Sequence, residues 1–443
     1  MHRYFPHTPD DVAAMLESIG AESVNELFAD IPDSLRLKRE GYDIPEGKDE
    51  MELRRYFTEI NARNKRLVCF AGAGFYDHYS PAVVAALASR SEFLTAYTPY
   101  QPEISQGTLQ YIFEYQSMMS ELTGLDITNA SLYDGATATA EAMLMCVAAS
   151  RKKNCVLVSE AVNPAVLEVV RTYGRYQRIE IELIPHVDGQ TDLSVLSEKM
   201  SKGNVAGVIA QAVNYFGVVE DFTGWSEVIH SMKGFFVINT NALALGVLRS
   251  PASWGADIAV GEAQSLGFSL NYGGPGLGYM SVTKALMRKM PGRIVGATTD
   301  SKGQTVFVLT LQAREQHIRR EKATSNICSN QGIMTLYAAI YLSLMGAEGL
   351  REINKASASA ARYALKRITS VVPAVSRLFA DKPFLNEFVL ENIDADKVIQ
   401  NGIKHGILAG VKVSGNRLML AFTEKRTKEE IDRLVELIKI SVK

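Results

Sequence analysis

Two apolar segments in the middle of the chain each end in polar residues of the kind that line active sites. Residues 234–239 (Gly-Phe-Phe-Val-Ile-Asn) end at Asn239, and Asn241 follows two residues later. Residues 255–262 (Gly-Ala-Asp-Ile-Ala-Val-Gly-Glu) are followed by Gln264 and Ser265. Side-chain amides are uncharged, and neither Gln264 nor Ser265 carries the primary amine that a Schiff base requires. These residues can therefore supply hydrogen bonds, but neither a counterion nor a covalent imine.

The spacing around the second segment resembles that of the fold type I (aminotransferase-like) enzymes, which use pyridoxal 5'-phosphate (PLP). In those enzymes a strand that opens Gly-Ala-Asp leads to a His-Lys pair, whose lysine lies eight residues after the aspartate and forms the Schiff base. Counted from Asp257, that pair is replaced here by Gln264 and Ser265. The preceding strand of those enzymes carries an aspartate that keeps the pyridine nitrogen protonated, and Asn239 stands in its place. The resemblance implies that this chain contains no catalytic residue.

An unrecognised lysine is the main alternative to that interpretation. The candidates occur in stretches typical of surface turns or helix ends: Lys233, Lys284, Lys289, Lys302 and Lys322. If one of them formed the Schiff base, the chain would be a self-sufficient PLP-dependent aminotransferase or decarboxylase. Such a protein would be yellow after purification and would lose its colour on borohydride treatment.

The elements that position these residues follow a regular order along the chain. Residues 1–62 are predicted to form an N-terminal helical arm, which includes helices over 22–29 and 50–65 and a linker with Pro and Gly over 41–48. From there, apolar strands alternate with helices, which is typical of a mostly parallel sheet covered on both faces. The expected strands are 66–71, 154–159, 178–184, 206–211 and 234–239. Residues 63–310 are thus predicted to be a large domain, and residues 311–443, entered through a helix over 309–320, a small C-terminal α/β domain.

Composition excludes several classes of function. The formal net charge is -2 and the pI about 6.4, so no basic field exists to attract nucleic acid or an anionic membrane. The four cysteines lie far apart and the seven histidines form no metal-binding pattern, which predicts a reducing cytoplasm and no metal. The N-terminus lacks the apolar core of a signal peptide, and apolar stretches such as 336–345 are too short to span a bilayer.

Several long segments between residues 97 and 328 carry a closer resemblance. They are Tyr97-Thr-Pro-Tyr-Gln-Pro-Glu-Ile-Ser-Gln-Gly, Leu122-Thr-Gly-Leu, Asn129-Ala-Ser-Leu-Tyr-Asp-Gly-Ala-Thr-Ala-Thr-Ala-Glu, Val260-Gly-Glu-Ala-Gln-Ser-Leu-Gly, Tyr272-Gly-Gly-Pro-Gly-Leu-Gly and Arg320-Glu-Lys-Ala-Thr-Ser-Asn-Ile-Cys. In these segments the chain resembles the alpha subunits of split glycine dehydrogenases (decarboxylating), the P-proteins of the glycine cleavage system. The arm and the overall length fit as well.

The resemblance implies a division of labour between two subunits. The beta subunit holds PLP covalently, and two alpha and two beta subunits form a heterotetramer. The complex decarboxylates glycine and passes the aminomethyl group to the lipoyl arm of H-protein. An alpha subunit alone is expected to be inactive.

The same resemblance assigns roles to two further groups of residues. Thr324, Ser325 and Asn326 occupy the place of a segment that reaches the phosphate of the partner's PLP in other members of the fold, although such residues before an apolar helix also form ordinary caps. Tyr97, Tyr100, Gln101 and Glu103 lie in a Pro-containing loop that either lines the mouth or lipoyl channel of the partner site or packs at the subunit interface.

Two other motifs leave alternatives open. The turn at 133–141 stands where active members bind the PLP phosphate, at the start of a helix whose amides attract anions, and here it is either vestigial or purely structural. Gly72-Ala-Gly74 would suit a nicotinamide enzyme, but Asp77 occupies the place of the third glycine of that fingerprint. A scaffold that never touches the chemistry is the third possibility.

Overall fold

The N-terminal arm consists of short capped helices. The computed structural model describes residues 4–36, 45–150, 152–312 and 315–442, and divides the chain into two units, residues 1–65 and 66–443. In the first unit, helix α1 (Pro9–Ile19) begins at Thr8, whose hydroxyl accepts a hydrogen bond from the Asp11 N–H. Helix α2 (Glu50–Asn61) has the same kind of cap at Asp49, whereas the helix predicted over 22–29 is a short 3-10 helix, η1 (Val24–Phe28). Residues 41–44 of the predicted linker lie outside the described residues.

A seven-stranded sheet forms the centre of the second unit. Its order is β2-β10-β9-β8-β7-β3-β4. The strands are β2 (Ile127–Thr128), β3 (Cys155–Ser159), β4 (Glu180–Ile184), β7 (Val205–Gln211), β8 (Phe235–Asn239), β9 (Ile258–Glu262) and β10 (Gly278–Val282). Neighbours from β9 to β4 run parallel, and β10 runs antiparallel to β9 and β2. The predicted mostly parallel sheet is confirmed.

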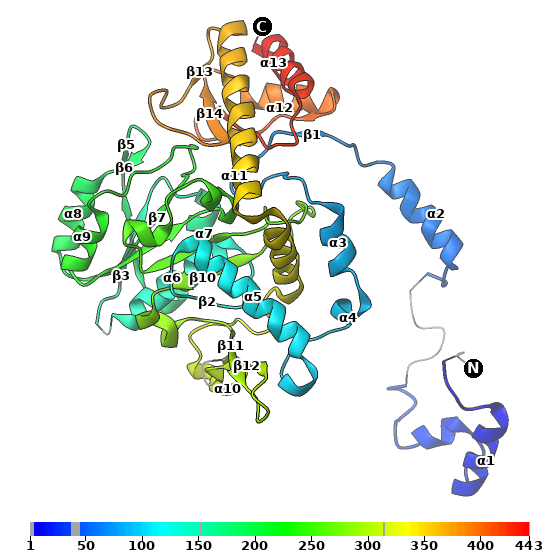
Figure 1. The fold of residues 1–443 in the computed structure, drawn as a ribbon. Helices are drawn as coiled ribbons and strands as arrows, with labels where there is room; N and C mark the ends of the chain where they lie inside the picture. Colours follow the sequence, from blue (N-terminus) through cyan, green and yellow to red (C-terminus); the bar gives the residue numbers. More distant parts are fainter. Residues whose placement is uncertain (1–3, 37–44, 151, 313–314, 443) are drawn as a thin grey trace. The chain divides into compact units, whose positions relative to one another are not determined.

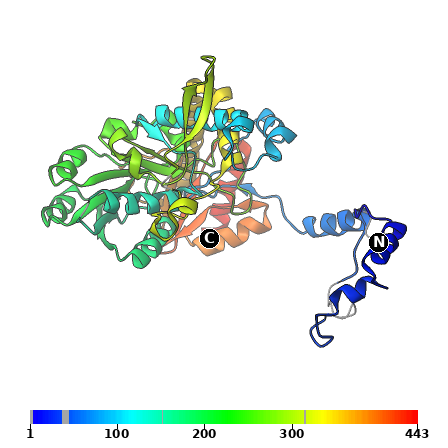
Figure 2. The same cartoon turned by 90° about the horizontal axis from the view of Figure 1, so that it is seen from below.

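Helices cover both faces of this sheet, as Figures 1 and 2 show. Val156 and Val158 pack on one face with α6 (Gly135–Ala149) and α7 (Pro164–Gln177). Leu157, which points the opposite way, packs with α8 (Leu193–Ser201) and α9 (Trp225–Ser231). Helices α5 (Gln106–Thr123) and α11 (Gly332–Val371) pack against the β9 and β10 end of the sheet. Because side chains on both faces are buried, the strands are continuously apolar.

The C-terminal part forms a smaller α/β layer pair. Its antiparallel sheet has the order β13-β14-β17-β16 and carries α12 (Ala395–Lys404) and α13 (Lys428–Val442). The strands are β13 (Ser376–Arg377), β14 (Glu387–Glu391), β16 (Val411–Val413) and β17 (Arg417–Ala421). The strand predicted over 66–71 is shorter, β1 (Val68–Cys69), and pairs in parallel with β15 (Ile407–Leu408) of this part of the chain. The segment before the large sheet thus completes the C-terminal layer.

The helix predicted over 309–320 is wrong. The structure has a hairpin of β11 (Ile294–Thr299) and β12 (Thr305–Thr310), followed by a single helical turn, α10 (Gln316–Arg319). Alternating β-branched residues in β12 favour a strand, and the Asp300 carboxylate accepts hydrogen bonds from the N–H groups of Lys302 and Gln304 to shape the turn. Residues 313 and 314 lie outside the described residues.

Helix α11 is the longest apolar element. By length and composition alone this helix could cross a membrane. The expectation that the apolar stretches, such as residues 336–345, are too short to do so therefore does not hold for the whole helix. Gly346, however, breaks the helical geometry with φ 57° and ψ -173°. The first half packs in the core beside Tyr115 and Tyr279, and the second half covers the C-terminal sheet. Its apolar residues thus serve the protein's own cores.

The remaining elements connect these layers. They are α3 (Ala82–Ala88), α4 (Ser91–Leu94), η2 (Pro102–Ile104), β5 (His186–Val187), β6 (Gln190–Thr191), η3 (Ala242–Gly246), η4 (Pro251–Trp254), η5 (Lys284–Lys289) and η7 (Arg320–Lys322).

Gly217 holds the turn after β7 against the C-terminal sheet. Its φ is +76°, and an added Cβ would lie 2.3 Å from the Glu387 carbonyl oxygen. Gly303 has φ +77° but nothing within 4 Å of its Cβ position. We expect Gly303→Ala to cost about 1 kcal/mol of unfolding free energy through backbone strain, and Gly217→Ala roughly 3 kcal/mol more through the clash. Urea denaturation of both variants checks this, and equal losses would contradict the steric argument.

Candidate functional site

A cavity of about 390 Å³ opens where the parallel strands end. The last residues of β7, β8 and β9 line it: Gln211, Asn239 and Glu262. The start of α6 forms one wall and the loop over residues 73–76 another. The carboxyl edge of a parallel sheet is where ligands bind in open α/β folds.

Gln264 is fixed beside this cavity by hydrogen bonds to the 73–76 loop and to its own turn. Its amide nitrogen donates to the carbonyl oxygens of Phe268 (2.7 Å) and Tyr76 (3.3 Å), and its amide oxygen accepts from the Tyr76 N–H at 3.2 Å. Ser265 accepts a hydrogen bond from the Asn241 amide at 3.1 Å. Both residues are 1% exposed. At the two positions counted from Asp257, the side chains are therefore buried, uncharged and hydrogen-bonded within the chain.

The Asn239 side chain is also hydrogen-bonded within the chain. Its amide nitrogen donates to the hydroxyl of Thr139 in α6 at 2.6 Å. The side chain is buried and uncharged, so it supplies no counterion for a protonated ring nitrogen. Asn241 caps η3 by accepting from the Leu243 N–H.

Glu262 is the one acidic side chain at the ends of the three strands that line the cavity. Its Oε2 accepts from the Gly135 N–H at 2.9 Å, and its Oε1 accepts from the N–H groups of Gln264 (2.9 Å) and Leu277 (2.8 Å). Burial raises the pKa of Glu262 to about 7, while the three backbone donors act in the opposite direction. The carboxylate thus lies at the start of α6, where an anion is most favourably placed.

The residues around this cavity do not fit a PLP group held by this chain. Of the described residues that line it, none is lysine or arginine. The five candidate lysines are all exposed, in turns or at the ends of short helices. A Schiff base requires an amine within the cavity. A phosphate at the start of α6 requires free donors, and there the Gly135 N–H already serves Glu262 and the Thr137 N–H serves Asp134.

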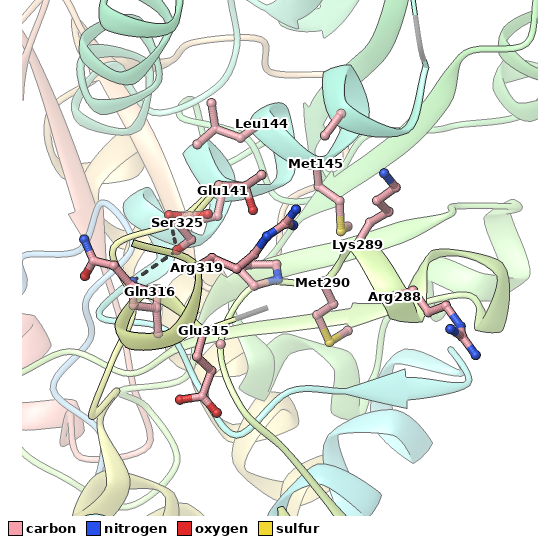
Figure 3. A pocket seen from close by; sticks show the side chains of 15 residues that line it. Glu141, Leu144, Met145, Arg288, Lys289, Met290, Glu315, Gln316, Arg319 and Ser325 are labelled. Carbon is pink, nitrogen blue, oxygen red and sulfur yellow. Dashed lines mark hydrogen bonds between the residues drawn. The ribbon is translucent and has the colours of Figure 1, made fainter. Parts of the chain in front are cut away.

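Ser325 points into its own chain. Its hydroxyl donates to the Glu141 carboxylate at 2.8 Å and accepts from the Ile327 N–H, as Figure 3 shows for the first contact. Burial raises the pKa of Glu141 to about 7. The pair lines a small cavity of about 100 Å³ together with Arg288, Lys289 and Arg319. Thr324 and Asn326 on either side are exposed.

The loop that carries Tyr97 and Tyr100 lies directly beside Cys328 and Ser329. The Tyr97 hydroxyl is 3.4 Å from the Ser329 hydroxyl, and Tyr100 accepts a hydrogen bond from Arg293 at 3.1 Å. Tyr97 also lines a cavity of about 320 Å³, with Arg293 and residues 329–333. The structure therefore joins Tyr97 and Tyr100 to Cys328 and Ser329. Gln101 and Glu103, at the short η2 helix, are exposed and stay outside this cluster.

Comparison with known proteins decides the family. A family model described as glycine cleavage system P-protein matches residues 2–438. The chain is 49% identical over 445 residues to a protein of Carboxydothermus hydrogenoformans named probable glycine dehydrogenase (decarboxylating) subunit 1, covering 98% of this chain and 99% of that protein. The chain belongs to the glycine cleavage system P-protein family. A subunit 1 of the same name from Bacillus thuringiensis is 47% identical over 98% of both chains, and the resemblance found in the sequence is confirmed.

Solved structures agree with this membership. A P-protein described as glycine decarboxylase of the glycine cleavage system, in inhibitor-bound form, superposes with a TM-score of 0.91 at 40% identity over 99% of both chains. A sphingosine-1-phosphate lyase of Burkholderia pseudomallei (TM-score 0.67, 14% identity, 90% and 92% coverage) shares the fold alone. So does an alanine–glyoxylate aminotransferase of Nostoc (TM-score 0.61, 15% identity, 93% and 100% coverage). The predicted fold type I architecture is confirmed.

Sequence reasoning missed four buried ionisable residues of this P-protein family member: Glu262, Arg293, Glu315 and Glu387. Glu387, at the start of β14, accepts from the Tyr76 hydroxyl at 2.7 Å and the Ala73 N–H at 3.1 Å. Arg293 and Glu315 form an ion pair with 2% and 4% exposed side chains. A signal was present for Glu262, since an acidic residue that ends a buried apolar strand has to find donors. Partners of Glu387 and Glu315 come from distant segments and leave no local pattern.

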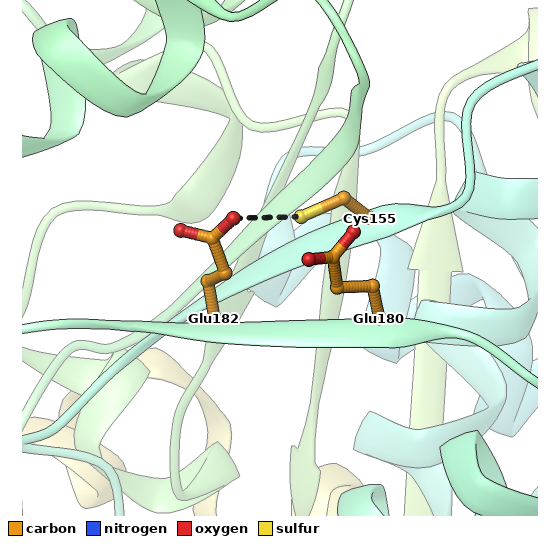
Figure 4. A group of neighbouring side chains, drawn as sticks. All are labelled: Cys155, Glu180 and Glu182. Carbon is orange, nitrogen blue, oxygen red and sulfur yellow. Dashed lines mark hydrogen bonds between the residues drawn. The ribbon is translucent and has the colours of Figure 1, made fainter.

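One group of potential metal ligands lies at the opposite edge of the sheet. Cys155, Glu180 and Glu182 come together at the beginnings of β3 and β4, as Figure 4 shows. Burial raises the pKa of Cys155 to about 11, so the thiol stays protonated, and Lys199 pairs with Glu182 at 2.6 Å. An ion pair at the strand beginnings accounts for this group without a metal.

Proposed function

We propose that this chain is the subunit without a Schiff-base lysine in a heteromeric glycine dehydrogenase (decarboxylating). A partner subunit would hold PLP covalently, decarboxylate glycine and transfer the aminomethyl group to the lipoyl arm of H-protein. The observation that carries the proposal is the hydrogen-bonded set of Asn239, Gln264 and Ser265 at the positions of the catalytic residues. Full-length similarity to proteins named subunit 1 supports it.

Within such an assembly, we assign this chain a positioning role near the partner's site. Tyr97 and Tyr100 lie with residues 328 and 329 in one surface cluster that includes a cavity. Thr324 and Asn326 are exposed next to it and are free to face a neighbouring subunit, while Ser325 fixes the segment through Glu141. Gln101 and Glu103 extend the same exposed loop. The proposed assembly contains two copies of each subunit, in the cytoplasm.

Reconstitution tests the division of labour. The purified chain alone is expected to be colourless and inactive in glycine–bicarbonate carbon exchange, because it lacks an amine that could bind PLP. Addition of a subunit with an intact His-Lys pair is expected to restore exchange by at least 100-fold over either chain alone. A yellow chain that becomes labelled on borohydride treatment would show instead that it is a self-sufficient PLP enzyme.

Site sharing has its own test in the reconstituted complex. We expect Thr324→Ala and Tyr97→Phe to reduce the exchange rate several-fold, because each removes one hydroxyl from the surface that faces the partner site. Tyr176→Phe on α7 is the matched control, since Tyr176 is 79% exposed and Tyr97 78%. The subunit ratio after gel filtration must stay unchanged. Unaltered exchange by both variants would leave this cluster an ordinary interface.

A further inference from the structure

The carboxylate of Glu262 lies in a small site built from three separate stretches of backbone. Its donors are the N–H groups of Gly135, Gln264 and Leu277, at 2.8–2.9 Å. Gly135 is the first residue of the 15-residue helix α6, whose dipole adds to the attraction for negative charge. The side chain is 7% exposed. In this geometry the carboxylate is bound as a separate anion would be.

The backbone around the carboxylate is shaped for close approach. An added Cβ at Gly276 would lie 3.0 Å from Glu262 Oε2, and one at Gly135 would lie 2.8 Å from the Glu262 nitrogen. At Gly278 it would lie 2.4 Å from the Asp134 carbonyl oxygen. These three glycines let the backbone of residues 134–135, 262 and 276–278 pack closely together beside the carboxyl group. A second anion cannot reach the same donors while this group is in place.

The charges of the side chains that line the adjoining cavity also disfavour a second anion. Asp134 uses its carboxylate to cap α6 through the Thr137 N–H, and it adds negative charge near Glu262. The other polar side chains on the wall are uncharged: the amides of Asn163, Gln211, Asn239 and Asn241, and the phenol of Tyr76. The described lining therefore offers a free phosphate group no lysine or arginine, and the Gly135 donor at the start of α6 is already occupied by Glu262.

We propose that Glu262 is a built-in anion that takes the place of a phosphate at the start of α6. In the wild-type chain it closes the cavity to phosphorylated ligands. Removal of its carboxylate should open a latent site for a small anion, either a carboxylate or a phosphate group. The inference concerns the isolated chain and is independent of the reaction that the proposed assembly performs.

Chemical rescue of the full-length chain tests this inference. Glu262→Ala removes the equivalent of one acetate ion and leaves three buried N–H groups without an acceptor, so its melting temperature should fall by several degrees. Sodium acetate and, separately, inorganic phosphate should recover at least half of that loss. Sodium chloride at equal ionic strength should not, because the rescue depends on filling the site rather than on screening.

Glu262→Gln is the matched control. The amide fills the same volume but directs an N–H₂ group toward backbone donors, so the variant should be destabilised and not rescued by either anion. The wild-type chain should respond to neither. Equal responses of all three proteins, or a folded Glu262→Ala chain that neither anion stabilises, would overturn the proposal. If Glu262→Ala does not fold, Glu262→Gln decides alone: stability equal to wild type would overturn it.

Discussion

Replacement of Glu315 by glutamine is expected to lower the unfolding free energy by about 3 kcal/mol or more. The carboxylate lies 3.3 Å from the Arg293 guanidinium, and the two side chains are only 4% and 2% exposed. Removal of one charge leaves the other buried without a counterion, which costs far more than the net value of the pair. Guanidinium or urea denaturation of the isolated chain measures the effect.

The same ion pair orients the aromatic loop. Arg293 donates to the Tyr100 hydroxyl and lies 5.0 Å from the centre of its ring. In Glu315→Gln the unpaired Arg293 should shift, and the loop around Tyr100 should shift with it. Glu348→Gln is the control, because its pair with Arg351 on α11 is exposed and should contribute less than about 1 kcal/mol. The double variant Arg293→Met with Glu315→Leu should be more stable than Glu315→Gln. Equal losses from Glu315→Gln and Glu348→Gln would contradict the buried-pair argument.

Stability of the isolated chain is expected to fall as the pH rises from about 4.5 to about 7. Burial raises the pKa values of Glu141 and Glu387 to about 7 from an ordinary value of 4.5, and it also raises the pKa of Glu220. In this pH range the folded chain binds more protons than the unfolded chain, so each rise in pH favours unfolding. A pKa change of this size corresponds to about 3 kcal/mol for each group at most. Most proteins lose stability toward acid, and this chain should do so only below pH 4.5, where partners such as Glu182 become protonated.

Denaturation curves at several pH values between 4.5 and 8 measure this trend. Glu387→Gln should make the slope of stability against pH shallower, because one of the titrating groups is lost. Glu436→Gln on the exposed face of α13 should leave the slope unchanged. A chain that is more stable at pH 8 than at pH 5 would contradict the expectation.

Local sequence patterns were enough to predict the sheet and the place of three polar residues at its edge. The strands around Val156, Val237 and Val260 are apolar on both faces. A continuously apolar strand can be recognised without knowing which residue faces which side of the sheet. Asn239, Gln264 and Ser265 follow directly from strand ends, so their place at the sheet edge needed only a count along the chain. Their hydrogen bonds to Thr139, Phe268 and Asn241 fix the three side chains at this edge.

Other features depend on contacts that no local pattern records. Ser325 was predicted to face a partner subunit, and the structure pairs it with Glu141, 184 residues away. The partner of Arg293, Glu315, lies beyond a hairpin, in a segment where the sequence predicted one long helix. The β-branched residues of Thr305–Thr310 favour a strand, but the segment is short, and its pairing with Ile294–Thr299 completes the hairpin.

The pairing of β1 with β15 has a consequence for biosynthesis. The Val68 N–H donates to the Gly406 carbonyl oxygen and the Phe70 N–H to that of Leu408, and the Phe70 carbonyl accepts from the Ala421 N–H. The ring of Phe70 is buried 5.4 Å from Phe422. A ribosome that adds about 5–20 residues per second needs on the order of half a minute to proceed from one partner to the other. During that time Phe70 has been synthesised but its core has not, so this short strand can pair only after residues 406–422 have been made.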